Sequence, residues 1–213
     1  MIVEQIVVGP LASNCYIIGD EEARCGIVVD PGDDAPLILE AIERLGLEIE
    51  AIVATHGHFD HIGAVGSVRE RTGAPFLAHS QEQEAIASAR IRAQLFAGLD
   101  IPETPPPDRL LEEGDLLSAG RYTLRVAHAP GHSPGHIVLL GDNVAFVGDV
   151  LFAGSIGRTD LPGGDYRELL RSISRVLLPL PDETMVYPGH GPVTTIGQER
   201  LSNPFLIGLP KGL

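Results

Sequence analysis

The chain has 213 residues, of which 44% are hydrophobic, and it carries a formal net charge of -14. This length and apolar content suffice for one substantial core, so we expect a single domain spanning residues 1–213. Because binding to phosphates needs concentrated Lys and Arg, the acidic balance argues against nucleic acid as a partner. The apolar runs fall short of the roughly 20 residues that span a bilayer, so no membrane partner is expected.

Two further features bear on the cellular compartment. Residues 1–5 carry neither a basic segment nor a long apolar run, so no secretory signal is predicted. The two cysteines, Cys15 and Cys25, are too few for a disulfide framework, which suits a reducing compartment. We therefore expect a cytoplasmic protein, and the sequence leaves its oligomeric state open.

Hydrophobic patterning predicts strands and helices along the whole chain. Short apolar runs bounded by turn residues predict strands at 2–8, 14–18, 26–29 and 51–54. Helices are predicted near 34–45, over 62–71, and over 81–97 as one helix or a pair. The proline-rich segment 102–108 is predicted to be a surface connection. A strand-rich stretch over 110–150 and a helix over 165–178 follow.

The segment 55–61 reads T-H-G-H-F-D-H and holds four side chains of the kind that bind metals, namely His56, His58, Asp60 and His61. Side chains must lie three or four residues apart to share a helix face, and this spacing does not fit one face. A strand that ends in a loop fits better, with the ligands fanned around a centre. The segment therefore predicts a metal site.

Four other apolar runs end in Gly or Pro together with His or Asp. The residues at these ends are Asp30, His128 with His132, Asp149, and His190. Ligands of α/β sheets collect at the carboxyl ends of strands, where loops converge. Together with the strand at 51–54, these strand ends therefore predict one common site.

Three histidines receive a weaker interpretation. His136 follows His132 by four residues, and we expect it to hold the turn beside the ligands rather than to bind metal. His128 is expected to be a structural or near-site residue. His79 ends an apolar run and is interpreted as a surface residue at a strand end or as the start of a helix.

The T-H-x-H-x-D-H element, followed by separate Gly-His, Gly-Asp and Gly-His elements, resembles the metallo-β-lactamase-fold hydrolase superfamily over nearly the whole chain. The resemblance implies an α/β fold, a four-layer αβ/βα sandwich with the site along one edge. It implies one metal held by His56, His58 and His132. It implies a second metal held by Asp60, His61 and His190, with Asp149 bridging the two and Asp30 orienting the site.

The ligand chemistry is compatible with that implication. Imidazole and carboxylate ligands without a thiolate suit zinc, iron or manganese, so we expect two divalent transition-metal ions, with zinc favoured. Two such ions can share a hydroxide and lower its pKa towards neutrality. Asp60 is expected to act in catalysis, because it can accept a proton or orient the hydroxide as well as bind metal.

Comparison within the superfamily narrows the resemblance. Its β-lactamases commonly use a cysteine ligand and lack a histidine at the position of His61, and its flavodiiron proteins usually carry glutamate at His58. What remains resembles glyoxalase II-like thioesterases (hydroxyacylglutathione hydrolases) and persulfide dioxygenases. Residues 154–160 read G-S-I-G-R-T-D, closer to the dioxygenase type and shared with short glyoxalase II-like bacterial proteins. Few residues follow His190, so the C-terminal helical domain that binds glutathione is expected to be absent.

Three functional hypotheses follow. The favoured one is hydrolysis of a small thioester at a dinuclear site. The alternatives are a mononuclear-iron persulfide dioxygenase, which would use His56, His58 or His132 with Asp149, and a non-enzymatic metal-binding protein. Arg158 is predicted to bind a substrate carboxylate, with an internal salt bridge to Asp160 or Asp165 as the alternative.

Overall fold

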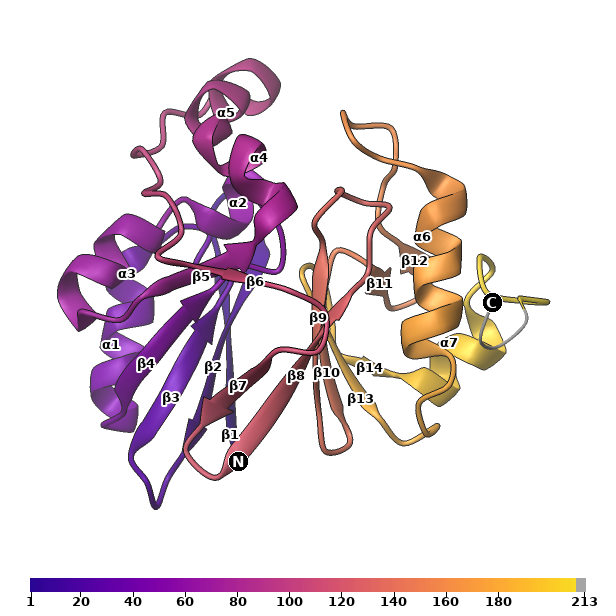
Figure 1. Cartoon of the computed structure of the whole chain (residues 1–213), viewed down its shortest axis with the longest axis horizontal. Coiled ribbons are helices and arrows are strands. Elements are labelled where there is room, and N and C mark those ends of the chain that lie inside the picture. Colours follow the sequence, from indigo (N-terminus) through magenta and orange to yellow (C-terminus); the bar gives the residue numbers. More distant parts are fainter. Residues whose placement is uncertain (210–213) are drawn as a thin grey trace.

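A computed structural model describes residues 1–209 and contains two six-stranded sheets that pack face to face (Figure 1). The strands of the first sheet are β1 (Ile2–Val8), β2 (Ser13–Asp20), β3 (Cys25–Val29), β4 (Glu48–Val53), β5 (Phe76–His79) and β6 (Arg109–Leu111). Their order in the sheet follows the chain. The pairs β1–β2 and β2–β3 are antiparallel, and the pairs from β3 to β6 are parallel.

The second sheet has the order β14-β13-β10-β9-β8-β7. Its strands are β7 (Leu116–Ala119), β8 (Tyr122–His128), β9 (Ile137–Gly141), β10 (Val144–Gly148), β13 (Met185–Pro188) and β14 (Thr194–Thr195). All its pairs are antiparallel except β10–β13. A separate two-stranded hairpin consists of β11 (Leu151–Phe152) and β12 (Ser155–Ile156).

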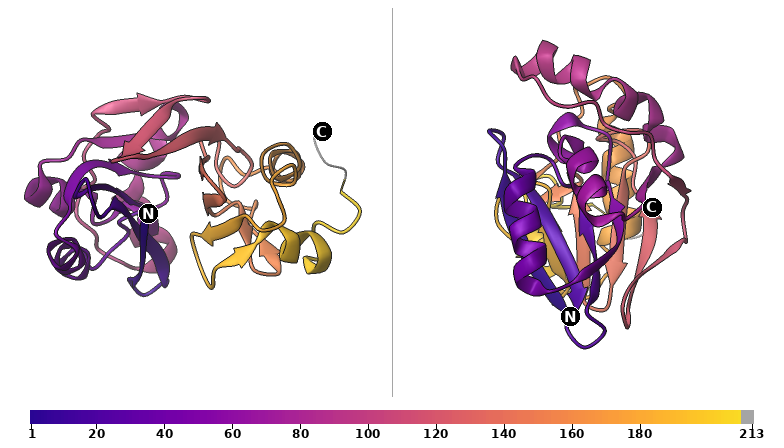
Figure 2. Two further views of the ribbon diagram at one scale, coloured as in Figure 1. Left: turned by 90° about the horizontal axis from the view of Figure 1, so that it is seen from below. Right: turned by 90° about the vertical axis from the view of Figure 1, so that its left-hand side faces the viewer.

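Helices cover the outer face of each sheet (Figure 2). On the first sheet they are α1 (Ala35–Leu45) and α3 (Val65–Thr72), whereas α2 (Phe59–Ile62), a short 3-10 turn (Ser80–Glu82), α4 (Gln83–Ala87) and α5 (Ala89–Ala97) lie at the upper end of that sheet in Figure 1. On the second sheet they are α6 (Tyr166–Ser172), which continues as a π-helical turn (Ile173–Leu177), and α7 (Ile196–Ser202). None of the helices in the described part of the chain is long and apolar enough to span a membrane.

Three apolar clusters separate these elements into four layers. Successive side chains of a strand point to opposite faces, so neighbours belong to different clusters. In β2, Ile17 packs towards the helices while Ile18 packs between the sheets, and Leu140 and Leu139 of β9 divide in the same way. Burial on both faces explains why these strands read as continuous apolar runs. The four-layer αβ/βα arrangement expected from the sequence is confirmed.

Most of the predicted elements are confirmed, with differences at their ends. The predicted helix over 62–71 begins only at Val65, because α2 ends at Ile62 and the chain bends at Gly63, where a Cβ atom would lie 2.5 Å from the carbonyl oxygen of Gly32. The segment 81–97 forms two helices rather than one. The segment 102–108 contains no helix or strand and is largely exposed, as predicted.

Candidate metal centre

Three imidazoles converge at the edge where β4 and β8 end. His56 follows β4, His58 directly precedes α2, and His132 lies in the loop after β8. The Nδ1 atom of His58 lies 3.0 Å from Nε2 of His56 and 2.9 Å from Nε2 of His132. The structure therefore brings together the three residues that the family resemblance assigned to the first metal.

The partners of these rings show which nitrogens carry lone pairs. The carbonyl oxygen of Arg158 can only accept, so Nδ1 of His132 donates to it at 2.8 Å and Nε2 is unprotonated. The Thr55 hydroxyl donates to Asp30 at 2.7 Å and accepts from Nδ1 of His56 at 3.1 Å, which leaves Nε2 of His56 unprotonated as well. Both Nε2 atoms lie against Nδ1 of His58, so three ring nitrogens converge where one cation can bind them.

A second group lies next to the first and consists of Asp60, His61 and His190. Nδ1 of His61 donates to Asp30 Oδ2 at 3.1 Å, so Nε2 faces the centre. That Nε2 atom lies 3.3 Å from Nε2 of His190 and 3.6 Å from Oδ2 of Asp60. The same Oδ2 atom accepts a hydrogen bond from the hydroxyl of Ser13 at 3.1 Å. These residues are the predicted ligands of the second metal.

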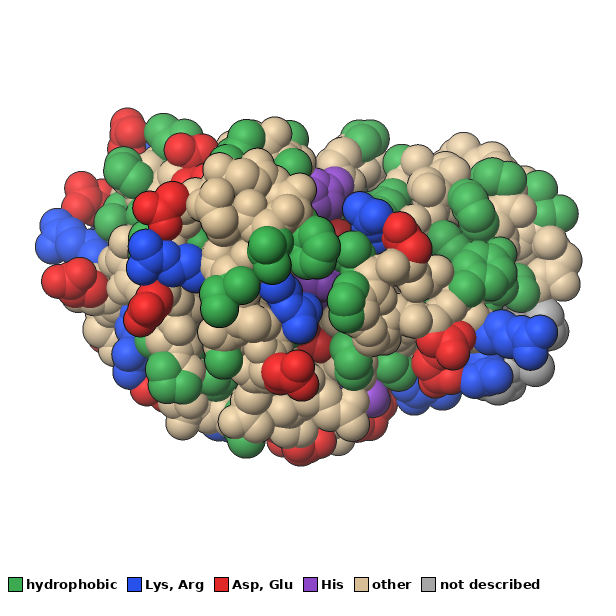
Figure 3. Space-filling model, turned by 90° about the horizontal axis from the view of Figure 1, so that it is seen from above, with side chains coloured by type: hydrophobic (Ala, Val, Ile, Leu, Met, Phe, Trp, Pro, Cys, Tyr) green, Lys and Arg blue, Asp and Glu red, His purple; other side chains and the backbone are tan. Residues whose placement is uncertain are grey.

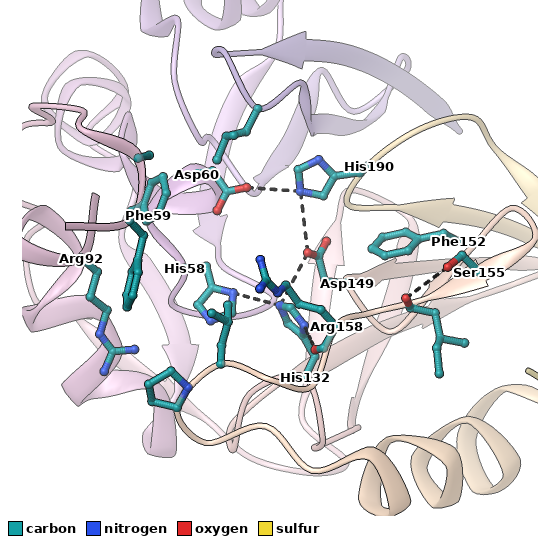
Figure 4. Close-up of a pocket in the computed structure, with 16 residues that line it drawn as sticks. His58, Phe59, Asp60, Arg92, His132, Asp149, Phe152, Ser155, Arg158 and His190 are labelled. Atoms are coloured by element: carbon teal, nitrogen blue, oxygen red, sulfur yellow. Dashed lines mark hydrogen bonds and ion pairs between the residues drawn. The ribbon is translucent and has the colours of Figure 1, made fainter. Parts of the chain in front are cut away.

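Asp149, directly after β10, connects the two groups (Figure 4). Its Oδ2 atom lies 3.5 Å from Nε2 of His132 and 3.7 Å from Nε2 of His190, and its Oδ1 atom lies 3.5 Å from Nε2 of His61. Within residues 1–209 the buried Oδ1 atom has no hydrogen-bond partner, which is the expected state of an oxygen reserved for a cation. A Cβ atom at position 189 would lie 2.1 Å from this oxygen, so only Gly189 fits there.

The protonation of the centre also suits cation binding. Burial lowers the pKa of His58 to about 3 and that of His56 well below its usual value, so both are neutral and ready to coordinate. Burial opposes protonation of His61, but the neighbouring carboxylates of Asp149 and Asp60 outweigh it and raise its pKa to about 10. A divalent cation would satisfy those carboxylates in place of the proton on His61. The nitrogen and oxygen donor set, without sulfur, fits divalent transition metals.

Two residues predicted to support the ligands occupy supporting positions. Asp30 accepts from the backbone N–H and the hydroxyl of Thr55 and from His61, and it adopts a positive φ of 52°. Such a conformation is uncommon for residues other than Gly, although Asp adopts it more readily than most. His136 is buried, and its Nε2 atom accepts from the backbone N–H of Asp149 at 3.0 Å. Its ring stacks on His56 at 4.7 Å.

Sequence reasoning missed a buried carboxylate behind the centre. Glu82, at 0% exposure, accepts hydrogen bonds from the backbone N–H of Gly57 at 2.7 Å, from the hydroxyl of Ser133 at 2.7 Å and from the backbone N–H of Gly135 at 2.6 Å. It therefore ties the loop that carries His56 and His58 to the loop that carries His132. The local sequence Q-E-Q-E is typical of an exposed helix and holds no signal for this role.

His79 and His128 form a separate pair, with stacked rings 4.4 Å apart. The expectation of a surface position for His79 is wrong, because its exposure is 4% and the ring of His128 covers it. The helix-start interpretation is confirmed, since Nδ1 of His79 accepts from the backbone N–H of Gln81 at 3.3 Å. Nε2 of His128 donates to the carbonyl oxygen of Pro134 at 2.8 Å, in agreement with a structural role.

A pocket of about 630 Å³ opens beside the metal centre, and histidine side chains are visible between the two halves of the molecule in Figure 3. Its apolar wall includes Phe59, Phe96, Phe152 and Leu161. Arg158 lines the pocket too, but its guanidinium is engaged by an acidic side chain. Its Nε and Nη2 atoms donate to the two carboxylate oxygens of Asp160 at 2.8 and 2.7 Å. The salt bridge foreseen as the alternative for Arg158 is therefore present, with Asp160 as the partner.

Sequence comparison identifies related proteins. A model of the metallo-beta-lactamase superfamily matches residues 8–190 of the chain. The hydroxyacylglutathione hydrolase GloC of Haemophilus influenzae is 41% identical over 210 residues, which cover 97% of this chain and 98% of GloC. The family resemblance inferred from the histidine motif is thus confirmed.

Solved structures agree with this result. The B3 metallo-β-lactamase BLEG-1 is 43% identical with a TM-score of 0.91, and the match covers 97% of this chain and 100% of BLEG-1. TTHA1623 in a di-iron-bound form is 42% identical with a TM-score of 0.88, at 96% and 100% coverage. ETHE1 from Myxococcus xanthus is 32% identical with a TM-score of 0.78, at 96% and 84% coverage. The fold, the His and Asp cluster and these matches lead to one conclusion: the chain belongs to the metallo-β-lactamase superfamily.

Proposed function

We propose that the protein is a metal-dependent hydrolase of small thioesters of the hydroxyacylglutathione kind, acting at a dinuclear site. The observation that carries the proposal is the pair of ligand groups on either side of Asp149, next to an open, largely apolar pocket. Members of this superfamily are generally hydrolytic enzymes. The likeness to GloC supports the thioester specificity.

The two ligand groups define where the cations would bind. His56, His58 and His132 would hold one ion, Asp60, His61 and His190 the other, and Asp149 both. Two divalent ions bound there would lower the pKa of a shared water towards neutrality and polarise the thioester carbonyl. Zinc suits these ligands, and iron or manganese suits them equally in chemical terms. The likeness to a protein solved in a di-iron-bound form supports iron as the alternative.

The chain itself orients the attacking water and the ligands of the second group. Burial raises the pKa of Asp60, but the neighbouring His61 and His190 lower it by a larger amount. The pKa therefore lies well below its usual value, and the carboxylate stays ionised at neutral pH. The hydroxyl of Ser13 holds one of its oxygens. We assign Asp60 the role of orienting the attacking water by accepting a hydrogen bond from it, because a carboxylate with so low a pKa is a weak proton acceptor. The chain of hydrogen bonds from Thr55 through Asp30 to His61 keeps that imidazole in place.

A persulfide dioxygenase is the second candidate, supported by the likeness to ETHE1 from Myxococcus xanthus. That reaction would use one iron held by two of the first three histidines and Asp149. It would leave Asp60, His61 and His190 without a metal, although their donor atoms converge on the same centre. This second group of donors is the reason that hydrolysis is the favoured function.

The test combines metal content with two activity assays. Protein loaded separately with zinc, iron or manganese is assayed for hydrolysis of a hydroxyacylglutathione with oxygen excluded, and for oxygen uptake with glutathione persulfide. A β-lactam serves as a third substrate, because of the likeness to BLEG-1. We expect two metal ions per chain and anaerobic thioester cleavage. Oxygen uptake in proportion to persulfide, without thioester cleavage, would favour the dioxygenase. Inactivity in every assay would favour a non-enzymatic metal-binding protein.

A further inference from the structure

One arginine of the pocket wall has a guanidinium that no acidic side chain neutralises. Arg92 and Arg158 both line the pocket beside the metal centre. Arg158 is engaged by Asp160. The half-buried Arg92, in contrast, makes no side-chain hydrogen bond or ion pair with any of residues 1–209. The acidic side chains that line the pocket, Asp60 and Asp149, point into the metal centre. Arg92 is therefore a cation next to the substrate space without a counter-ion.

The position of Arg92 follows from the packing of α5. This helix buries Ala89 and Ala93 against the core and packs against α2. Arg92 and Phe96 are four residues apart, so they are neighbours on one helix face, and both line the pocket. The wall that α5 contributes thus places a positive charge beside an aromatic ring.

The arrangement across the pocket gives the direction in which a substrate would extend. Figure 4 shows Arg92 on the opposite side of the pocket from Phe152 and Ser155, with His58 and Asp149 between them. A thioester whose carbonyl lies at Asp149 can therefore extend one end towards Arg92. A group bound there would lie at a distance from the reacting carbonyl.

The charges of the molecule and of Arg92 indicate that the group bound there is an anion. A net charge of -14 repels anions, so an unpaired guanidinium in the pocket provides local attraction for an anionic group. The planar fork of Arg matches the two oxygens of a carboxylate, and the energy of such a contact exceeds that of a neutral hydrogen bond. A neutral substrate would leave this guanidinium without a partner.

We propose that Arg92 binds a carboxylate that the substrate carries at a distance from its thioester carbonyl. The enzyme then prefers anionic thioesters to neutral ones of the same size. This inference rests on the proposed function, because it specifies the substrate class of the same pocket.

The test uses metal-loaded protein and two thioesters that differ in one distal group, a carboxylate in one and a carboxamide in the other. Arg92→Gln should lower the ratio of kcat/KM for the carboxylate to kcat/KM for the carboxamide by about tenfold, the effect of one charged contact at a partly exposed site. Arg92→Lys should lower it less, since it keeps the charge and loses the fork. Arg90→Gln is the matched control. It removes the same charge from the same helix, where Arg90 pairs with Asp100 at 3.0 Å, and should leave the ratio unchanged.

Equilibrium binding of the two corresponding non-hydrolysable thioethers separates this inference from the proposed function. Wild-type protein that hydrolyses neither thioester, yet binds the carboxylate thioether about tenfold more tightly than Arg92→Gln does, would overturn the thioesterase proposal and support the role of Arg92. Hydrolysis by the wild type with the same selectivity and the same thioether binding in Arg92→Gln would overturn the role of Arg92 alone. An equal loss of selectivity in Arg90→Gln would also overturn it.

Discussion

Replacing Glu82 by Gln should weaken both the fold and the metal centre, although the side chain touches no predicted ligand directly. The two carboxylate oxygens accept three hydrogen bonds, from Gly57, Ser133 and Gly135. A Gln of the same shape has one oxygen, which can keep the bonds from Ser133 and Gly135. Its amide group would then face the N–H of Gly57, and two donors would meet in a buried space.

The structure sets the size of the effect. One charge-assisted hydrogen bond is lost, and one buried N–H is left without an acceptor, which costs about 1–3 kcal/mol. The two remaining bonds lose the negative charge of their acceptor. We expect a fall of about 3 kcal/mol in the free energy of unfolding, measured by denaturant titration of the metal-free protein. Because Gly57 lies between His56 and His58, metal affinity should fall as well, by about tenfold to a hundredfold.

The matched control is Glu84→Gln, which removes the same charge from an exposed position two residues further along, in α4. It should change neither the unfolding free energy nor the metal affinity. Equal stability of Glu82→Gln and wild type would refute the reasoning, because it would mean that the carboxylate is not an ionised acceptor of three hydrogen bonds.

Further predictions concern the metal centre, pH and the pocket. Asp149→Ala should lower the content of both metals in elemental analysis, and normal metal content would contradict the bridging assignment. Metal uptake at pH 7 should release protons in a weakly buffered titration, because His61, with its pKa raised to about 10, must lose its proton. In the metal-free protein, the stability due to that raised pKa is complete below about pH 6.5 and should disappear as the pH rises through about 10. Hydrogen bonds from Arg121 hold the pKa of Asp20 well below its usual range. The stability that this shift provides is present above about pH 4 and is lost as the pH falls through the lowered pKa. Arg121→Gln should therefore raise the pH at which the protein unfolds in acid. Arg158→Lys should lower the melting temperature if the pair with Asp160 is its main role, whereas a rise in KM for an anionic thioester at unchanged stability would support substrate binding.

The amino-acid sequence by itself predicted the strands and a metal site, and its resemblance to a known superfamily implied the layered architecture and a candidate ligand set. Apolar runs such as 26–29 and 51–54 predict strands because burial on both faces demands continuous apolar residues. The dense spacing of His56, His58, Asp60 and His61 predicts a metal site because four potential metal ligands rarely occur within six residues by chance. The groups that the sequence placed at strand ends lie together because those ends meet at one edge of the molecule.

Only the tertiary structure decided the contacts between segments far apart in the chain. Glu82 lies in a stretch that is typical of an exposed helix, yet it is buried because the loops carrying Gly57 and Gly135 close over it. His79 is buried because His128, on another strand, stacks on its ring. Arg92 and Arg158 are equivalent by residue type, and the position of Asp160 leaves one guanidinium paired and the other unpaired. Local patterns predict strands and the types of metal ligand, because each depends on residues close together in the chain. The hydrogen-bond, ion-pair and stacking partners of a side chain depend on packing, because packing brings distant segments together.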